Sequence, residues 1–192
     1  PLLNKEEREH WQQTIRQGSI RSLQLLARLF EITDKLDQSG IETLPLKGPV
    51  LAHALYGDTS QRHMRDLDLL VEQKDIMKTL EVLRGMGYSL KYPAKELSAK
   101  QWNRYFTQQY DVVLVHQKDG SILELHTRLA YPALLGGLEK RITQEFEKVK
   151  LNGRQIKSLS KEGSLLYLAI HGAHHLFFRL FWLRDLSSAL TR

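Results

Sequence analysis

The sequence contains no cysteine among its 192 residues. Disulfide bonds, cysteine nucleophiles and thiolate-bound metals are therefore excluded. Long apolar runs are missing as well, because no stretch approaches the roughly 18 uninterrupted apolar residues of a membrane span. The segment Pro1–His10 is polar and charged, unlike a secretory signal. These absences are compatible with the cytoplasm, where we expect the protein, and they predict no membrane partner.

The composition is otherwise that of an ordinary globular protein, with 42% hydrophobic and 26% charged residues. A chain of this length can form one well-buried core with a helical appendage. The net charge of +6, from 28 Lys and Arg against 22 Asp and Glu, suits a polyanionic ligand such as a nucleotide. A nucleic-acid partner stays open, but the basic residues are scattered and form no block that supports one. Solvated surface residues explain the same surplus equally well.

Apolar periodicity, capping residues and turn residues predict helices and strands along most of the chain. Helices are expected over 4–17, 19–40, 49–56, 76–85 and 138–149, and again from residue 160 onward. Strands are expected over 41–46, 66–71, 110–116 and 121–128, with a hairpin around Asn152-Gly153. Strands flanked by helices, followed by terminal helices, indicate an α/β or α+β core with a helical tail.

The same pattern divides the chain into N-terminal helices over 1–40, a core over 41–158 and a helical segment over 159–192. The last residues, 186–192, still have helical character without a stop signal. We therefore expect the helical segment to continue beyond Arg192 in a longer protein.

Two aspartates on one predicted strand are the sharpest chemical feature of the sequence. Asp66 and Asp68 flank Leu67 at the start of an otherwise apolar segment. Alternate residues of a strand share a face, so the two carboxylates lie side by side, about 6–7 Å apart at their Cα atoms. Adjacent carboxylates repel unless a cation lies between them, and a divalent metal commonly fills that role. Two solvated aspartates at a strand end are the alternative, because isolated Asp-x-Asp tripeptides are common.

Three neighbouring features favour the metal interpretation. A predicted strand ends at Lys47-Gly48, where a helix begins, and backbone N–H groups at such helix starts bind phosphate. Arg62 precedes the aspartates and could neutralise phosphate charge or form a structural ion pair with Asp58 or Asp66. Glu124 lies in the middle of another apolar strand and could supply a third carboxylate.

Several segments around these residues carry a family resemblance. They are Leu46–Ala52, Leu55–Asp58, Arg62, Met64–Val71, Leu123–Leu129, His171–His175 and Arg179–Leu186. Together they resemble the uncharacterised bacterial nucleotidyltransferase family, which belongs to the DNA polymerase β-like superfamily. The similarity runs in patches from about Leu44 to Leu186, and its central patch is the most specific.

The resemblance implies an α+β fold, in which a mixed or antiparallel sheet carries flanking helices and a C-terminal helical segment. It also implies a site for two Mg²⁺ ions, or Mn²⁺ in their place, and for a nucleoside triphosphate such as ATP. The expected metal ligands are Asp66, Asp68 and Glu124, and the expected phosphate-binding residues are Lys47, Gly48 and Arg62. Two departures stand out, because Lys47-Gly48 replaces the usual Gly-Ser pair and Glu124 replaces the more usual aspartate.

Three histidines are candidates for lining the site. His126 follows Glu124 by two residues, so both lie on the same face of the predicted strand. His171 and His175 are one helical turn apart, and they could contact the substrate, make helix hydrogen bonds or hold zinc. No Glu occupies the position that metalloprotease helices use, and no third zinc ligand is obvious. The nearby aromatic residues are interpreted as core, with nucleobase stacking as the alternative; they are Phe177, Phe178, Phe181 and Trp182.

These observations predict metal-dependent transfer of a nucleoside monophosphate from a nucleoside triphosphate to an acceptor, with release of pyrophosphate. Protein, nucleic acid, sugar phosphate and antibiotic-like small molecules all stay open as acceptors. A non-catalytic nucleotide-binding or regulatory module with the same fold is the main alternative, and the altered glycine turn supports it. A histidine-centred metal hydrolase and a structural protein with an incidental acidic strand are further alternatives.

Overall fold

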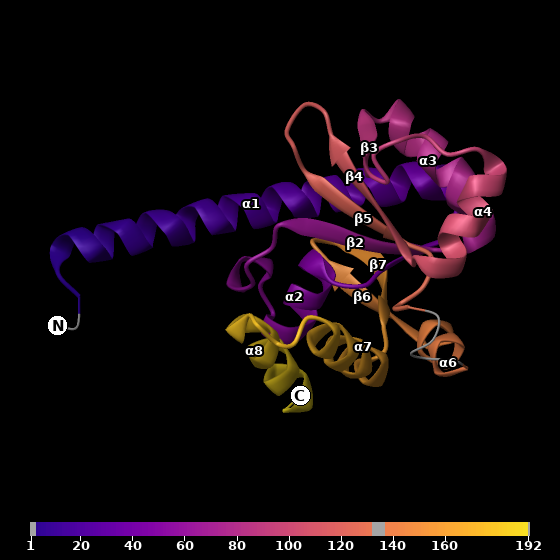
Figure 1. Ribbon diagram of the computed structural model, residues 1–192. Coiled ribbons are helices and arrows are strands. Elements are labelled where there is room, and N and C mark those ends of the chain that lie inside the picture. Colours follow the sequence, from indigo (N-terminus) through magenta and orange to yellow (C-terminus); the bar gives the residue numbers. More distant parts are fainter. Residues whose placement is uncertain (1–2, 132–136, 192) are drawn as a thin grey trace.

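The computed structural model describes residues 3–131 and 137–191. The described residues form a five-stranded mixed sheet, a two-stranded sheet and helices packed around them (Figure 1). The strands are β1 (Thr43–Pro45), β2 (Asp66–Val71), β3 (Tyr88–Tyr92), β4 (Asp111–His116), β5 (Ile122–His126), β6 (Phe146–Leu151) and β7 (Arg154–Leu159). The helices are α1 (Lys5–Gln38), α2 (Gly48–Tyr56), α3 (Ile76–Gly85), α4 (Ala99–Gln108), α6 (Leu138–Gln144), α7 (Lys161–His174) and α8 (Leu180–Leu190), with short 3-10 turns η1 (Thr59–Gln61) and η2 (Gln73–Asp75).

The larger sheet has the strand order β1-β2-β5-β4-β3. β2 and β5 pair in parallel, and the other neighbours pair antiparallel. The parallel register places Asp68 opposite Glu124 and Leu70 opposite His126. The mixed sheet with its helices confirms the expected α+β fold class.

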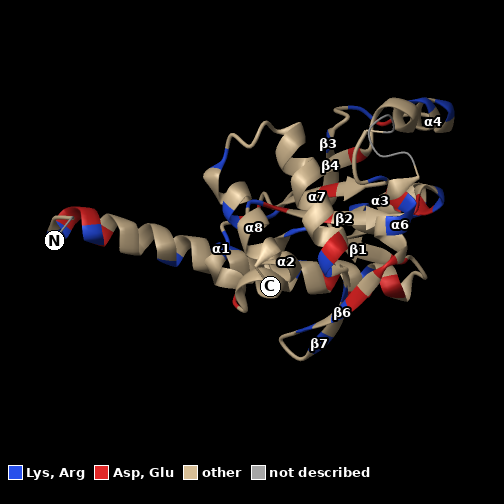
Figure 2. Cartoon of the chain, turned by 90° about the horizontal axis from the view of Figure 1, so that it is seen from below, with Lys and Arg blue, Asp and Glu red and all other residues tan. Residues whose placement is uncertain are grey.

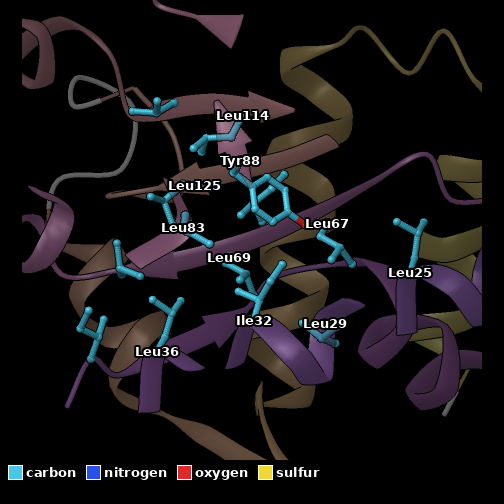
Figure 3. Close-up of a cluster of buried hydrophobic side chains, with 14 of the residues drawn as sticks. Leu25, Leu29, Ile32, Leu36, Leu67, Leu69, Leu83, Tyr88, Leu114 and Leu125 are labelled. Atoms are coloured by element: carbon cyan, nitrogen blue, oxygen red, sulfur yellow. The ribbon is translucent and has the colours of Figure 1, made fainter. Parts of the chain in front are cut away.

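One face of this sheet forms the main apolar core (Figure 3). Alternate residues of β2, Leu67 and Leu69, point to this face, together with residues of β4 and β5. α1 covers it with one stripe of side chains: Leu25, Leu29, Ile32 and Leu36. Each fully buried leucine contributes about 1.5–3 kcal/mol relative to an exposed one, so this face supplies much of the stability.

α1 is a single helix of 34 residues, and the expected break at residues 18–19 is wrong. Its start is as predicted, because Asn4 caps the first turn in a reciprocal capping box with Glu7. Ser19 caps no second helix, since its hydroxyl donates to the carbonyl oxygen of Ile15 in the preceding turn. A glycine inside a helix costs about 1 kcal/mol, which is too little to interrupt it at Gly18. The N-terminal part of α1 extends beyond the sheet (Figure 1).

The middle of the chain contains two elements that sequence periodicity did not predict, β3 and α4. The helix predicted over 138–149 is too long, because α6 ends at Gln144 and β6 begins at Phe146. β6 pairs with β7 along its whole length, and this pairing outweighs the local helical pattern. The predicted hairpin turn is confirmed, with positive φ angles at Asn152 and Gly153.

The C-terminal part consists of α7 and α8, joined by a turn in which Leu176 and Phe177 have positive φ. Ser160 caps α7 by accepting a hydrogen bond from the amide of Gly163. α8 ends at Leu190, and Arg192 lies outside the described residues. No helix in the described ranges has both the length and the apolar character that a bilayer crossing requires. The division of the chain into 1–40, 41–158 and 159–192 stays a prediction.

Candidate functional site

The second face of the sheet carries a polar patch whose carboxylates come from adjacent strands, whereas Leu70 on the same face of β2 packs against a second apolar cluster. Asp66 and Asp68 alternate with the buried leucines of β2, so their side chains point away from the apolar core. The parallel pairing with β5 brings Glu124 directly opposite Asp68. Acidic positions on these strands lie next to α7 (Figure 2). The three predicted carboxylates therefore share one face of the sheet.

His126 completes the densest group of potential metal ligands among the described residues. Ligand atoms of Asp68, Glu124 and His126 all lie within 4.8 Å of one another. His126 Nε2 is 3.4 Å from Asp68 Oδ1 and 3.8 Å from Glu124 Oε2. Asp66 is not part of this group, although it was the first of the predicted ligands. The structure thus places a histidine, predicted only to line the site, among the carboxylates.

Lys47 balances the charge of the most buried carboxylate. Its Nζ lies 2.7 Å from Asp68 Oδ1 and 3.4 Å from His171 Nε2. The two side chains are 8% and 1% exposed, so this is a buried ion pair rather than a surface contact. The amide of Leu46 donates a hydrogen bond to the carbonyl oxygen of Asp68, and this bond holds the start of α2 against β2.

Gly48 begins α2 with a φ of +71°, a left-handed conformation that favours glycine. Pro49 follows in the first turn, as expected for a helix start. The expected helix opening at this turn is therefore present. Gly48 itself does not line the cavity beside the carboxylates, so its contact with phosphate stays a prediction.

The crowding of negative charge changes the titration of these acids. Burial, together with the charges of Asp68 and Glu124, raises the pKa of Asp66 to about 6. Burial acts in the same direction on Asp68, but Lys47 and His126 hold the pKa of that carboxyl well below its usual range. The pKa of His126 is raised to about 9 because its two carboxylate neighbours outweigh the effect of burial. A carboxylate set that repels in this way fits a divalent cation.

Arg62 forms a structural ion pair, but its partner is neither of the two aspartates that the sequence suggested. Its Nε donates to Asp185 Oδ2 on α8 at 2.9 Å, and neither Asp58 nor Asp66 pairs with it. The hydroxyl of Tyr56 donates to the other oxygen of Asp185 at 2.6 Å. Arg62 is 7% exposed and still borders the cavity beside the carboxylates. This buried network ties α8 to the segment before β2.

A cavity of about 200 Å³ lies against the end of β2 that carries the aspartates, and we call it the β2 cavity. Its lining residues are Lys47, Arg62, His63, Met64, Arg65, Asp66, Asp68, Glu124, His171, His175, Phe178, Arg179, Phe181 and Trp182. Four of these are lysine or arginine residues that surround the carboxylates. Neither Arg65 nor Arg179 was among the predicted site residues, although both lie in segments with family resemblance. A larger cavity of about 520 Å³ beside α6 contains none of the predicted site residues.

The C-terminal histidines and aromatic residues close the β2 cavity from the side of α7 and α8. The rings of His171 and His175 meet edge to face with centroids 4.7 Å apart. Burial and the neighbouring Lys47 lower the pKa of His171 to about 3, so this side chain is neutral. Neither histidine belongs to the group of close metal-ligand atoms found among the described residues. Trp182 contacts both rings and is largely buried, whereas Phe178 is exposed at the cavity.

Residues 1–192 match the family described as uncharacterised nucleotidyltransferase. The chain belongs to this family. No curated protein sequence matches the chain. The resemblance seen in the sequence patches and the assignment to a nucleotidyltransferase enzyme family are thereby confirmed.

Three solved structures of antibiotic-modifying nucleotidyltransferases share the fold at low sequence identity. The lincosamide antibiotic adenylyltransferase LnuA, bound to lincomycin, is 18% identical with a TM-score of 0.52, covering 84% of this chain and 93% of its own. The antibiotic-resistance factor ANT(2'')-Ia in solution is 12% identical with a TM-score of 0.62, covering 88% and 84%. Its crystal structure with adenylyl-2''-tobramycin is 12% identical with a TM-score of 0.61, covering 88% of both chains. At this identity the likeness shows the fold alone.

Proposed function

We propose that the protein is a metal-dependent nucleotidyltransferase, which transfers a nucleoside monophosphate from a nucleoside triphosphate to an acceptor hydroxyl and releases pyrophosphate. The observation that carries this proposal is the placement of Asp66, Asp68 and Glu124 on one face of two parallel strands, beside a cavity lined by cationic side chains. Membership of a nucleotidyltransferase family supports the reaction class.

In this proposal, the carboxylates hold the metal and the cationic residues bind the phosphates of the substrate. Asp66, Asp68 and Glu124 are the residues that would hold Mg²⁺ or Mn²⁺, with His126 beside them. A bound metal supplies positive charge to the triphosphate and lowers the pKa of the attacking hydroxyl. The phosphate-side charges of the chain itself are Lys47, Arg62, Arg65 and Arg179. Lys47, which is paired with Asp68 in the structure, would be able to bind a phosphate oxygen if a cation neutralised that carboxylate.

The reaction itself balances without a further reactant. The acceptor oxygen forms a bond to the α-phosphorus, and the bond from that phosphorus to the bridging oxygen breaks. Pyrophosphate leaves with the electron pair of the broken bond, and Glu124 accepts the proton of the acceptor hydroxyl. Positioning and charge neutralisation supply most of the rate in this class of reaction.

The solved structures with the same fold support ATP as the donor and a small molecule as the acceptor. LnuA is described as an adenylyltransferase of lincosamide antibiotics, and ANT(2'')-Ia was solved with an adenylylated tobramycin. The alternative of a non-catalytic nucleotide-binding module draws on the buried Lys47–Asp68 ion pair, which already neutralises the central carboxylate. That alternative predicts nucleotide binding without pyrophosphate release.

The first experiment is isothermal titration of nucleoside triphosphates with Mg²⁺ or Mn²⁺, followed by an assay with α-labelled ATP. We expect metal-dependent binding in the wild type, its loss in the Asp66→Asn/Asp68→Asn variant and its retention in Glu72→Gln. Glu72 is a suitable control because it is an exposed acid at the far end of β2. Circular dichroism checks that each variant is folded. Wild-type binding and turnover by the double variant would contradict the proposal.

A further inference from the structure

A second cavity, which we call the α7 cavity, lies on the other side of Glu124. Its volume is about 130 Å³. Its lining residues are Tyr110, Asp111, Glu124, His126, Leu129, Ala130, Tyr131, Tyr167, Ile170, His171, His174 and His175. Glu124, His171 and His175 also line the β2 cavity, so the two cavities meet at the carboxylate that is proposed to accept the proton.

The charges on the two sides of Glu124 differ in sign. The β2 cavity is lined by four lysine and arginine residues and three acids. The α7 cavity is lined by two acids, Asp111 and Glu124, and by no lysine or arginine, and its cationic side chain is His126, whose pKa is raised. Asp111 is its second acid, and no lysine or arginine of the described chain forms an ion pair with this carboxylate. A triphosphate is repelled by such a surface, and a cation is attracted to it.

The sheet register places Asp111 on the same face as Glu124. Asp111 of β4 pairs with His126 of β5, while Val113 pairs with Glu124. Asp111 and Glu124 are therefore diagonal neighbours, and such positions lie roughly 7–8 Å apart at their Cα atoms. A single molecule of the size of a sugar ring could therefore contact both carboxylates. One of its substituents would bind Asp111, and a hydroxyl on another carbon would face Glu124.

A buried tyrosine shows that the cavity offers hydrogen bonds as well as charge. Tyr167 is 1% exposed, and among the described residues its hydroxyl has no hydrogen-bond partner. Nδ1 of His126, also buried, is without a partner in the same part of the chain. Buried polar groups are nearly always satisfied, so both groups point to a polar ligand or water.

We propose that the α7 cavity is the acceptor subsite and that it selects a small hydroxylated molecule carrying a positively charged amine. Asp111 binds the amine, the Tyr167 hydroxyl binds a hydroxyl of the ring, and a second hydroxyl faces Glu124. Tyr110 and Tyr131, which meet edge to face at 4.8 Å between centroids, form the apolar wall. This assignment rests on the proposed function for the role of acceptor, but the binding preference itself does not depend on turnover.

The test measures binding of D-glucosamine and its uncharged analogue D-glucose by saturation-transfer NMR and titration calorimetry. We expect the wild type to bind glucosamine at least about tenfold more tightly than glucose, because an amine bound to a half-buried carboxylate makes a charge-assisted hydrogen bond. Asp111→Asn should bring the two affinities to near equality. Glu72→Gln should leave the ratio as in the wild type, because Glu72 is exposed and lines neither cavity.

Tyr167→Phe is the second variant, because it removes one oxygen and keeps the ring in place. We expect it to weaken both sugars several-fold and to keep their ratio. A wild type that binds neither sugar, or that binds both equally, overturns the inference, and so does a preference that survives Asp111→Asn. ATP binding with Mg²⁺ is measured on the same samples. Loss of glucosamine preference with intact ATP binding refutes the acceptor site alone, whereas a preference without ATP binding refutes the proposed function alone.

Discussion

The two faces of the five-stranded sheet are formed by the same strands but differ in character, since one is the apolar core and the other carries the candidate site. On β2, Leu67 and Leu69 are 2% and 0% exposed in the apolar core, whereas Asp66 and Asp68 line the β2 cavity. The apolar face gains stability from every side chain it buries. The polar face gains little, because desolvation offsets most of the attraction in a buried pair such as Lys47–Asp68. One strand therefore supports the fold with alternate residues and presents chemistry with the others.

The comparison also explains why the polar face tolerates its charges. Lys47 before α2 and His126 of β5 contact Asp68, and Arg62 before β2 lines the same cavity while it is paired with Asp185. Removal of one partner leaves an uncompensated charge in the protein interior. We therefore expect substitutions on the polar face to impair binding and catalysis as well as stability, and substitutions on the apolar face to act on stability alone.

The largest effect is expected from Asp68→Asn, which removes a proposed metal ligand. Nucleotidyl transfer should fall at least about a thousandfold, since electrostatic stabilisation of the transition state is the main contribution of such a site. The rate is measured with α-labelled ATP and saturating acceptor. Leu69→Ala, at the next position of the same strand, serves as the matched control and should retain turnover below its unfolding temperature. Similar rate losses in both variants would break the proposed division between the faces.

The next effect concerns the buried network of Arg62, Asp185 and Tyr56. Asp185→Ala should destabilise the protein by about 3–5 kcal/mol, because it leaves the Arg62 guanidinium buried without its partner. It should also weaken ATP binding, because Arg62 then loses its fixed position at the β2 cavity. Urea denaturation and titration calorimetry measure the two effects. Glu9→Gln, which breaks an exposed ion pair with Lys5, should change stability by less than about 1 kcal/mol.

On the apolar face, Leu69→Ala should lower the free energy of unfolding by about 2–5 kcal/mol, because it creates a cavity in a fully buried position. The folded variant should bind ATP and Mg²⁺ with wild-type affinity, since its side chain points away from the carboxylates. Urea denaturation gives the first quantity and calorimetry the second. A change in affinity comparable to that of Asp68→Asn would show that the two faces are coupled.

The smallest effects are expected from replacing two glycines, and they distinguish the cost of an unfavourable backbone conformation from the cost of crowding a side chain. Gly48→Ala should cost about 1–2 kcal/mol, because the residue has a φ of +71° while an added Cβ meets only an ordinary contact, 3.6 Å from Leu67 Cδ2. Gly18→Ala in α1 should instead add about 0.5–1 kcal/mol of stability, since a Cβ there has nothing within 4 Å. Thermal and urea denaturation measure both. Equal effects at the two glycines would show that the turn before α2 tolerates a side chain.

Local patterns predicted the parts of the fold that depend on neighbours in sequence. β2 has the bounds that its alternation predicted, Asp66–Val71, and the first helix begins directly after Asn4, as predicted. The break at residues 18–19 failed because one glycine costs less than the packing of a continuous helix gains. The end of the predicted helix over 138–149 failed because pairing with β7 is not visible in a local window.

The same distinction between local and long-range features applies to the candidate site. The sequence indicated the carboxylates, Lys47 and the helix start at Gly48, whose roles in metal and phosphate binding stay predictions. It did not indicate the pairing of Arg62 with Asp185, 123 residues away. Nor did it place Arg179 at the β2 cavity or Asp111 at the α7 cavity. Contacts of this kind depend on how separate elements pack, which local periodicity does not encode.

The sequence alone determined which face each residue of β2 takes, because the two-residue period of a strand is a local property of the backbone. It also determined the absence of thiol chemistry and the acidic character of the site. Only the tertiary structure decided that β5 lies parallel to β2, so that Asp68 lies opposite Glu124, and that His171 of α7 lines the same cavity as both carboxylates. These features depend on long-range packing, because the entropy cost of bringing distant segments together is offset only when the whole core is buried.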